Sequence, residues 1–415
     1  MNILYSALVL TVWFMSTFFT VSMLLIVLEK KRAFTAKVKY PPVHPKVSII
    51  LPAYNEENGI LPALDSLAKI KYPSSLFEII VVNDGSKDGT SKIVRDFISQ
   101  NKNLDISFID RKENKGKSFS LNEGIRMSKG EFVGCMDGDS IVQPGILSKI
   151  VGYFNDPKVA SVSVKVNVRE PKSLLEKIVD VEYAVGLSIS LKILSMLDSM
   201  HVTPGPFSIY RKSVLLKLGG FDEKNITEDL EIAFRLQEHG YKLAFCLSTS
   251  VSTKVPSTLN SLYKQRKRWY SGSILTVLQH KELLFDRRMN VFGFFLPFNY
   301  SLIFFGMSLF LYSLYLYATK FITGVNHLRL VNFDILSSPL TFNLDLLSVD
   351  IFTTLALSMI VLTIILTKVS FNAIHRKVRE NITGFIGFLF FFILYQFFWL
   401  GSFYAVVRGR EIKWR

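Results

Sequence analysis

The chain has 415 residues, of which 49% are hydrophobic, 20% charged and 13% aromatic, and its formal net charge is +15. Ordinary soluble proteins are about a quarter charged, so this composition, with a mean hydropathy of +0.30, indicates membrane segments and excludes disorder or a coiled coil. The two cysteines, Cys135 and Cys246, lie in apolar strand-like runs and predict neither a disulfide framework nor a metal knot, which fits a reducing environment.

The first predicted element is a retained transmembrane helix over residues 1–28. This run carries no charge, is longer than the apolar region of a signal peptide and lacks a basic segment before it. The basic stretch from Lys30 to Lys46 places the following residues in the cytoplasm by the positive-inside rule. We therefore expect an integral protein of the plasma membrane whose soluble domain, residues 29–275, is cytoplasmic.

Short apolar strands alternate with helical stretches in this soluble block, which predicts an α/β fold with parallel strands. The expected strands cover residues 47–52, 78–83, 106–109 and 131–136, with helices at 58–70 and from about 87 to 98. Ligands bind beyond the carboxyl ends of the strands in such sheets. The acidic and glycine-rich stops of this chain all follow strand ends, so a site is expected there.

Three motifs stand at those ends: Tyr54-Asn55-Glu56, Asn83-Asp84-Gly85-Ser86 and Asp137-Gly138-Asp139. Turns rich in Asn, Asp, Gly and Ser are ordinary in themselves, and the bare Asp-x-Asp spacing is a weak signal. Its position directly after a buried strand is informative, because two carboxylates there offer hard oxygen ligands to Mg²⁺ or Mn²⁺, which a diphosphate would complete.

Two later motifs each have a local alternative. Thr227-Glu228-Asp229-Leu230 opens a helix that runs to about residue 239, and it also fits simple capping, with Thr227 as the N-cap and acids favoured in the first turn. The run 265–269, Gln-Arg-Lys-Arg-Trp, also fits an interfacial helix with snorkelling arginines. The apolar stripe over 173–200 predicts a core helix, with a membrane-lying or acceptor-lining helix as the alternative.

Further apolar runs near 292–317, 351–366 and 384–407 predict about three transmembrane helices within residues 291–407. An interfacial helix is expected at 276–290 and a basic tail at 408–415. Basic residues cluster beside the spans, where they meet membrane lipids, so nucleic acid is not an expected partner. One span before the domain and three after it would put the basic tail outside, so either the positive-inside rule fails there or one run is re-entrant or interfacial.

Together these motifs resemble the membrane-integrated family 2 glycosyltransferases, which include cellulose, chitin, hyaluronan and poly-N-acetylglucosamine synthases. The resemblance covers about residues 47–272 in the family order: an acid after the second strand, DxD, a TED box and QxxRW. Asn114-Lys115-Gly116-Lys117 is similar to the nucleotide-contacting loop, and residues 204–211 to the GPxxxYR stretch of the hyaluronan and chitin branch. The resemblance implies a GT-A fold, a Rossmann-like mixed sheet, joined to transmembrane helices.

The resemblance also implies roles for single residues. Four residues would hold the uridine: Tyr54, Glu56, Asp84 and Lys117. Asp137 would contact the nucleotide and, with Asp139, the divalent metal, while Asp229 would be the general base. The role of Glu228 is less defined, because a neighbour on a helix points about 100° away. The acceptor would contact Gly205, Pro206, Phe207, Gln265 and Trp269. Arg268 would reach the diphosphate.

The implied reaction is inverting, metal-dependent transfer of a sugar from a nucleotide sugar, with UDP expected as the nucleotide, to a hydroxyl of a growing polysaccharide. One alternative is a single addition to a lipid carrier such as a polyprenyl phosphate or a glycolipid. The other is a transporter that only senses nucleotides, which the near absence of charge inside the spans argues against. Four spans are few for a polymer channel, which leaves room for accessory or homo-oligomeric membrane subunits. The sequence does not distinguish the donor sugars.

Overall fold

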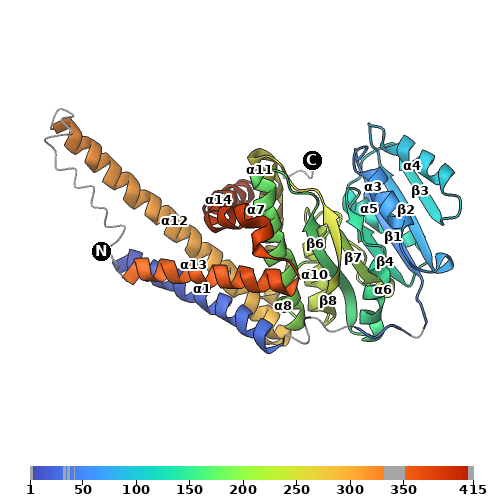
Figure 1. Cartoon of the computed structure of the whole chain (residues 1–415), viewed down its shortest axis with the longest axis horizontal. Helices are drawn as coiled ribbons and strands as arrows, with labels where there is room; N and C mark the ends of the chain where they lie inside the picture. Colours follow the sequence, from blue (N-terminus) through green and yellow to red (C-terminus); the bar gives the residue numbers. More distant parts are fainter. Residues whose placement is uncertain (1–2, 31–33, 35–37, 42, 331–350, 410–415) are drawn as a thin grey trace.

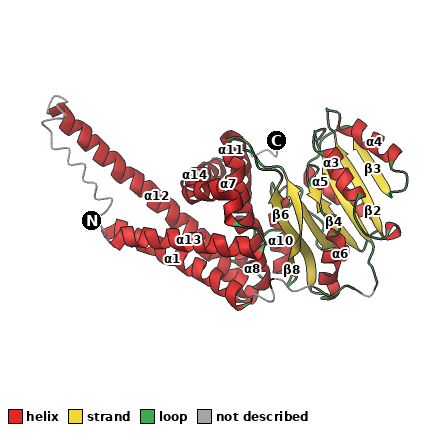
Figure 2. Ribbon diagram, in the orientation of Figure 1, coloured by secondary structure: helices red, strands yellow, loops and turns green. Residues whose placement is uncertain are grey.

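The computed structural model describes residues 3–30, 34, 38–41, 43–330 and 351–409. An α/β domain lies at one end of the molecule and a group of long helices at the other (Figure 1). All strands belong to the first part, as the secondary-structure colouring shows (Figure 2).

The domain is built on one eight-stranded sheet with the order β3-β2-β1-β4-β7-β6-β8-β5. Its strands are β1 (Val47–Ala53), β2 (Phe77–Asp84), β3 (Ile106–Arg111), β4 (Phe132–Met136), β5 (Ile141–Val142), β6 (Val159–Val168), β7 (Phe207–Arg211) and β8 (Lys242–Thr253). The first four pair in parallel, β7 runs antiparallel to both β4 and β6, β6 and β8 are parallel, and β5 is antiparallel to β8. The mixed sheet confirms the predicted GT-A class.

Apolar runs make the central strands because both faces of the sheet are covered. All eight residues of β2 are buried, as expected for a parallel strand between two helical layers. Successive side chains alternate between the layers: Ile49 and Leu51 join one hydrophobic cluster, and Ile50 joins the other. The domain helices are α3 (Ile60–Ala68), α4 (Thr90–Gln100), α5 (Lys117–Met127), α6 (Ile146–Ile150), α9 (Lys212–Lys217) and α10 (Glu228–Glu238).

Within the described part of the chain, four helices are long and apolar enough to cross a membrane: α1 (Ile3–Glu29), α12 (Asn290–Leu330), α13 (Ile351–Ala373) and α14 (Ile382–Val407). The first three pack together, with the Trp13 indole donating to the Ser358 hydroxyl at 2.9 Å and the Phe18 and Phe298 rings 5.8 Å apart. In Figure 1, α14 is seen nearly end-on, whereas α1, α12 and α13 are seen from the side and lie in the plane of the picture. Hence α14 runs across the other three.

The segment between the sheet and the long helices differs from the prediction of one helix over 173–200. It forms α7 (Leu174–Glu182), a π-helical stretch (Tyr183–Ser190) and α8 (Leu191–Met196). A capping box at Ser173 and Glu176 begins α7. Ile193 and Leu194 are buried in a core cluster, which fits the core reading of this stripe.

The interfacial helix expected over 276–290 is wrong as one element. Helix α11 (Leu259–Gln279) already includes the first residues of this range, and Asn225 donates to the Thr276 hydroxyl at 3.0 Å. The chain then makes two short 3₁₀ turns, Lys281–Leu283 and Arg287–Met289. The Phe285 amide donates to the Gly293 carbonyl at 2.8 Å, which turns the chain into α12.

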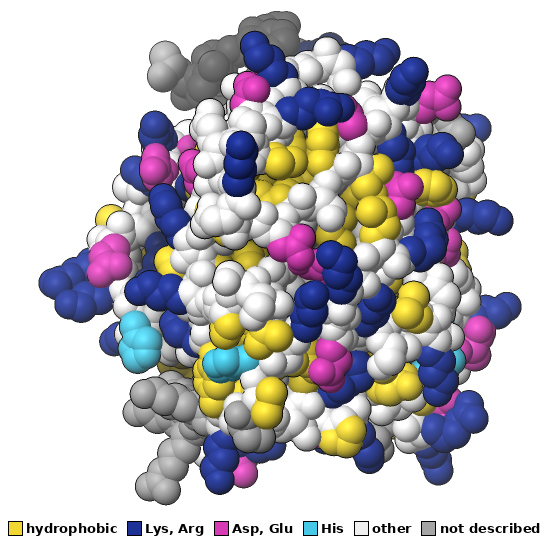
Figure 3. Space-filling view, turned by 90° about the vertical axis from the view of Figure 1, so that its right-hand side faces the viewer, with side chains coloured by type: hydrophobic (Ala, Val, Ile, Leu, Met, Phe, Trp, Pro, Cys, Tyr) yellow, Lys and Arg dark blue, Asp and Glu magenta, His cyan; other side chains and the backbone are white. Residues whose placement is uncertain are grey.

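The face of the domain turned away from the helices is shown in Figure 3. Lysine and arginine side chains are scattered over this face among acidic and neutral ones, and they do not gather into one stripe.

Candidate active site

The loops after β1 and β2 are tied to one another. The Asn55 amide donates to the Ser86 hydroxyl at 2.9 Å, and the Lys87 amide donates to the Asn55 side chain at 2.9 Å. Asn55 has a positive φ of 54°, which asparagine tolerates better than most residues. The adjacent Glu56 amide donates to Thr90 at 2.8 Å. These contacts fix Tyr54 and Glu56 at the carboxyl edge of the sheet, where the sequence predicted them.

Asp84 ends β2 with only 3% of its surface exposed. Its carboxylate accepts hydrogen bonds from the amides of Lys115 and Gly116, at 2.9 and 2.8 Å, and pairs with Arg111 at 2.7 Å. Asp84, which the resemblance assigns to uridine binding, thus also holds the loop that leads to Lys117. Gly85 follows with a φ of +73°, and a Cβ there would lie 2.7 Å from the Glu113 carbonyl carbon, so this turn requires glycine.

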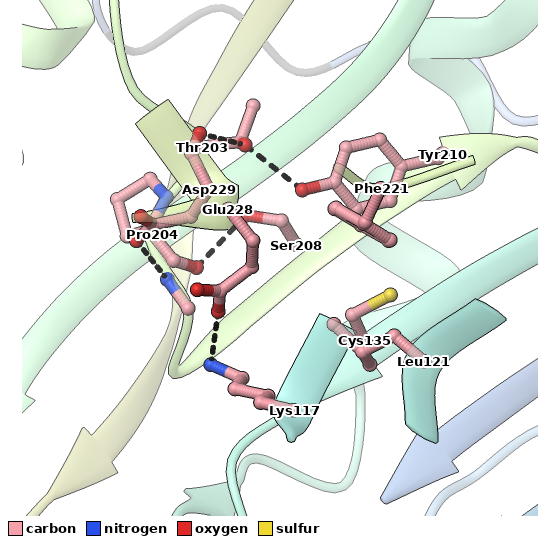
Figure 4. Close-up of a pocket in the computed structure, with 11 residues that line it drawn as sticks. Lys117, Leu121, Cys135, Thr203, Pro204, Ser208, Tyr210, Phe221, Glu228 and Asp229 are labelled. Carbon is pink, nitrogen blue, oxygen red and sulfur yellow. Dashed lines mark hydrogen bonds and ion pairs between the residues drawn. The ribbon is translucent and has the colours of Figure 1, made fainter. Parts of the chain in front are cut away.

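Lys117 is the hub of the site. It begins α5, and its ammonium lies 2.6 Å from an oxygen of Asp137. The same ammonium lies 2.7 Å from an oxygen of Glu228 (Figure 4). Burial alone would lower the pKa of Lys117, but the charges of Asp137, Glu228 and Asp229 more than offset burial and raise the pKa above its ordinary value. Three motifs therefore meet at one ammonium group: the basic loop, the DxD motif and the TED box. The sequence showed their order along the chain but not that they lie close together.

Asp229 is the next residue on α10 and lines the same pocket as Glu228. Its Oδ2 accepts from the Gly205 amide at 3.2 Å, and its carbonyl accepts from the Thr203 hydroxyl at 2.7 Å. Burial, followed by the charge of Glu228, raises the pKa of Asp229 to about 6, whereas Lys117 and Arg268 act in the opposite direction. A carboxylate with this pKa is ionised at neutral pH yet can accept a proton.

The capping reading of this turn is not realised as expected. Thr227 makes no side-chain hydrogen bond to the first turn of α10, and its hydroxyl instead donates to Asn225 at 3.1 Å. Glu228 and Asp229 both line the pocket despite their adjacent positions on the helix. The pocket is lined by Lys117, Leu121, Cys135, Thr203, Pro204, Gly205, Ser208, Tyr210, Phe221, Glu228 and Asp229.

Asp137 and Asp139 lie in the turn after β4, on either side of the buried Gly138. Both are partly exposed, and the Thr253 hydroxyl donates to Asp139 at 3.3 Å. A Cβ placed on Gly59 would lie 3.0 Å from both the Asp139 Cβ and a Glu56 oxygen, so Glu56 also belongs to this edge. No cluster of three metal-ligating side chains occurs among the residues that the structure describes. The two aspartates supply the hard oxygen donors that Mg²⁺ or Mn²⁺ takes alongside phosphate oxygens.

The GPxxxYR stretch divides between site and core. A Cβ on Gly205 would lie 3.1 Å from the Lys117 nitrogen and 3.3 Å from an Asp137 oxygen, so this residue closely lines the pocket. Pro206 is partly exposed beside it. Phe207, predicted to contact the acceptor, is fully buried in a core cluster, because it begins β7 with its side chain in the covered layer. Its position is that of a packing residue.

The QxxRW run lies on α11 and contains a fully buried arginine. The Arg266 guanidinium pairs with Glu182 of α7 at 2.8 Å, lies 4.2 Å from the Trp269 ring centroid and donates to the Gln265 side chain at 3.0 Å. The Arg268 charge acts on Asp229, which connects α11 to the pocket. Gln265 and Trp269 are thus both held by Arg266, a residue that the motif leaves unspecified.

Sequence reasoning missed several residues. Arg111 holds Asp84, and its place at the carboxyl end of β3 was the same signal that singled out Asp84. Tyr210 donates its hydroxyl to Thr203 at 2.8 Å, and Cys135 lines the pocket with a thiol whose pKa burial raises. Tyr210 lies in the recognised GPxxxYR stretch, but that resemblance assigned no role to it. Cys135 lies within β4 and not after its end, so it carried no positional signal.

The solved structure of a mannosyltransferase from Pyrobaculum calidifontis, in complex with GDP-mannose and Mn²⁺, matches 78% of this chain and 92% of its own, with a TM-score of 0.59 and 20% identity. A likeness of this extent shows the fold. Together with the mixed sheet, it shows that the domain has the GT-A fold.

The sequence comparisons are more specific. The profile of glycosyltransferase-like family 2 matches residues 44–272, more than half of the chain. The poly-β-1,6-N-acetyl-D-glucosamine synthase of Staphylococcus epidermidis is 31% identical over 277 residues, and that of Staphylococcus aureus is 32% identical over 241 residues. The first alignment covers 66% of this chain and 65% of the relative, and the second covers 58% and 56%. The chain belongs to glycosyltransferase family 2, as its motifs predicted.

Proposed function

We propose that this family 2 glycosyltransferase transfers a sugar from a UDP-sugar, with inversion and with the help of a divalent cation, to a hydroxyl of a growing polysaccharide. The observation that carries the proposal is the meeting of Asp137, Glu228 and Asp229 around Lys117. One group poised to take a proton lies beside groups that can bind phosphate and metal. This is the arrangement that displacement of a nucleotide diphosphate requires.

Asp229 is the proposed general base. Its raised pKa of about 6 suits removal of a proton from an acceptor hydroxyl near neutral pH, and a positioned base typically contributes about 10² to 10⁴ in rate. Glu228 supports it by pairing with Lys117 at 2.7 Å and by keeping the pKa of Asp229 high. Attack on the face opposite the nucleotide converts an α-linked donor into a β-linked product.

The donor half of the site is proposed to lie on the other side of Lys117. Tyr54, Glu56 and Asp84 stand at the edge where uridine would bind, and Arg268 would contact the diphosphate. Asp139, together with Asp137, would hold Mg²⁺ or Mn²⁺, which neutralises the leaving diphosphate when bound. Without a donor, the negative charge of Asp137 is balanced by its ion pair with Lys117.

The acceptor is proposed to rest against α11, on Gln265 and Trp269, with Gly205 and Pro206 on the pocket side. The names of the staphylococcal relatives make N-acetylglucosamine the first donor sugar to examine, and a β-1,6-linked polymer the first product. The proposed location is the plasma membrane with the sheet domain in the cytoplasm, where nucleotide sugars are available; accessory membrane subunits remain part of the proposal.

A panel of UDP- and GDP-sugars tests the proposal with the purified full chain in lipid bilayers, using nucleotide diphosphate release and mass analysis of the product. We expect turnover with UDP-N-acetylglucosamine, dependence on Mg²⁺ or Mn²⁺, and chains of many sugars. A product with one added sugar at every donor excess would favour the lipid-carrier alternative. Absence of release with every donor would contradict the enzyme assignment of the site.

A further inference from the structure

The last long helix, α14, is anchored to the catalytic domain where it begins. Its N-cap residue Asn381 donates to the Lys177 carbonyl at 2.9 Å and to the Asp180 carboxylate at 3.0 Å, both on α7. Gly384, one turn on, packs so closely that a Cβ would lie 2.3 Å from the Lys177 carbonyl oxygen. The first turn of α14 therefore lies directly on the domain.

The second half of α14 also contacts the domain. The Tyr395 hydroxyl donates to Glu182 of α7 at 2.5 Å, and the Trp399 ring stacks on Tyr270 of α11 at 4.1 Å with an interplanar angle of 4°. A Cβ on Gly401 would lie 2.5 Å from the Tyr263 hydroxyl oxygen of α11. Contact with the domain is thus continuous from the first turn of α14 to within two turns of its end.

This arrangement does not fit a helix that crosses the bilayer. Residues 381 and 401 are about 30 Å apart along a helix, as far as the hydrocarbon core of a bilayer is thick. If α14 spanned the bilayer, α7 and α11, which contact it along its length, would have to extend through the hydrocarbon core beside it. Their many charged side chains exclude that position. These are Glu176, Lys177, Asp180 and Glu182 on α7, and Lys264, Arg266, Lys267 and Arg268 on α11.

The charges at the two ends of α14 agree with this reading. Arg376, between α13 and α14, pairs with Asp180 of the domain at 2.6 Å, so the end of α13 lies on the domain side. Lys377 and Arg379 precede α14, and Arg408 follows it. Basic residues beside membrane helices lie preferentially on the cytoplasmic side. Because basic residues stand at both ends of α14, they favour a position of both ends on that side.

The remaining face of α14 is apolar and exposed. Ile386, Phe390 and Ile393 are 52%, 67% and 44% exposed along one stripe. Further along it, Phe397 meets Phe310 of α12 with ring centroids 5.0 Å apart. Contact with a helix of the spanning group places this stripe at hydrocarbon depth, so its partner is lipid acyl chains.

We propose that α14 does not cross the membrane but lies within the leaflet next to the catalytic domain, with one face on α7 and α11 and the other in lipid. Of the four long helices described, α1, α12 and α13 then cross, and residue 409 lies on the same side as the sheet domain. Three crossings remove the conflict between the span count and the basic residues after α14. A helix in this position is apolar all round because protein covers one face and lipid the other.

Single-cysteine labelling in sealed membranes tests the sidedness. The native Cys135 and Cys246 are buried and give a low background with an impermeant maleimide. G409C is compared with K87C, which reports the domain side, and with N326C, near the far end of α12, which reports the opposite side. We expect G409C to be labelled together with K87C. Labelling of G409C together with N326C would overturn the proposal.

Depth measurements test the same proposal without relying on sidedness. Spin labels at positions 386, 393 and 404, all on the exposed face, are compared by their accessibility to oxygen and to a water-soluble nickel chelate. A helix in the leaflet plane gives similar depths at all three positions. A spanning helix gives depths that change by about 1.5 Å per residue, or about 27 Å from 386 to 404, and that gradient would overturn the proposal.

Discussion

The carboxyl edge of the sheet and the seam between α11 and α14 are both proposed parts of the active site, but they are built differently. At the sheet edge, polar side chains converge because parallel strands end together, and Lys117 pairs with Asp137 and Glu228. At the seam, Arg266 is fully buried between Glu182, Trp269 and Gln265. In the proposed reaction, the first region serves charge and proton transfer, and the second holds the acceptor.

The difference has an energetic side. A partly exposed carboxylate such as Asp139 contributes little to stability, so its replacement should have a large effect on chemistry and a small effect on folding. A buried arginine is different, because removal of its partner leaves an unpaired charge in the protein and strongly destabilises it. The following experiments separate the two regions, beginning with the largest expected effect.

Replacement of Asp139 by Asn should abolish sugar transfer, because an amide is a poor ligand for a divalent cation. Chelation with EDTA should have the same effect in the unsubstituted protein. Thermal unfolding and membrane insertion should be unchanged, and D156N, at an exposed aspartate outside the site, serves as the matched control. Transfer at the normal rate in both D139N and EDTA would show that the metal assignment is wrong.

Replacement of Asp229 by Asn keeps the shape of the side chain and removes the base. We expect kcat to fall by about two to four orders of magnitude while UDP binding, measured by calorimetry, persists. D222N, at an aspartate in the loop before α10, is the control. Loss of stability and donor affinity with a near-normal kcat would instead support a purely structural role for this turn.

The pH profile tests the same residue with a smaller change. Asp229 acts as a base only when ionised, and its pKa is raised to about 6, so kcat/KM should be constant above that pH and fall about tenfold per unit below it. E228Q removes the neighbouring negative charge and should move this fall to lower pH. A fall that moves to higher pH in E228Q, or that is absent near pH 6, would contradict the assignment.

The sheet edge could be predicted from the sequence in most respects, because strand ends are local features. β1, β2 and β4 begin and end within about one residue of the expected ranges, and the motifs between them follow directly. The convergence of Lys117, Asp137 and Glu228 could not be predicted, because residues from three separate segments meet only in the folded sheet. Phe207 was assigned to the site because it lies within a recognisable motif. The alternation of side chains along β7 instead points it into the core.

The contacts between α7, α11 and α14 could not be predicted from the sequence. Glu182, Arg266 and Tyr395 lie far apart in the chain, and no periodicity relates them. The apolar run at 384–407 was correctly predicted as a helix, but its length and hydropathy are those of a spanning helix. The contacts of this helix with α7 and α11 indicate another placement. Hydropathy measures the preference for an apolar environment, and it does not specify whether a helix crosses the bilayer or lies in its plane.

Trp269→Ala tests the acceptor side of the seam. Loss of an aromatic stacking surface is typically worth about 1 kcal/mol or more, or about fivefold in acceptor binding, so the product chains should become shorter or stop. UDP affinity should be unchanged. W13A, in α1, controls for general effects of removing a tryptophan. Normal chain lengths in W269A, measured by size-exclusion chromatography, would remove Trp269 from the acceptor site.

Tyr395→Phe asks whether α14 positions the acceptor residues. The tyrosine hydroxyl donates to the same Glu182 oxygen that pairs with Arg266, and Arg266 in turn contacts Gln265 and Trp269. Loss of one donor leaves the ion pair intact but frees Glu182 to shift, so a change of a few-fold is expected rather than loss of folding. The KM for acceptor should rise and the chains should shorten, whereas UDP release in the absence of acceptor should not change. Y404F, at a half-exposed tyrosine of the same helix, is the matched control. An equal fall of UDP release and chain length in Y395F would show that the seam and the sheet edge act as one unit, and no change in either would show that α14 is an anchor alone.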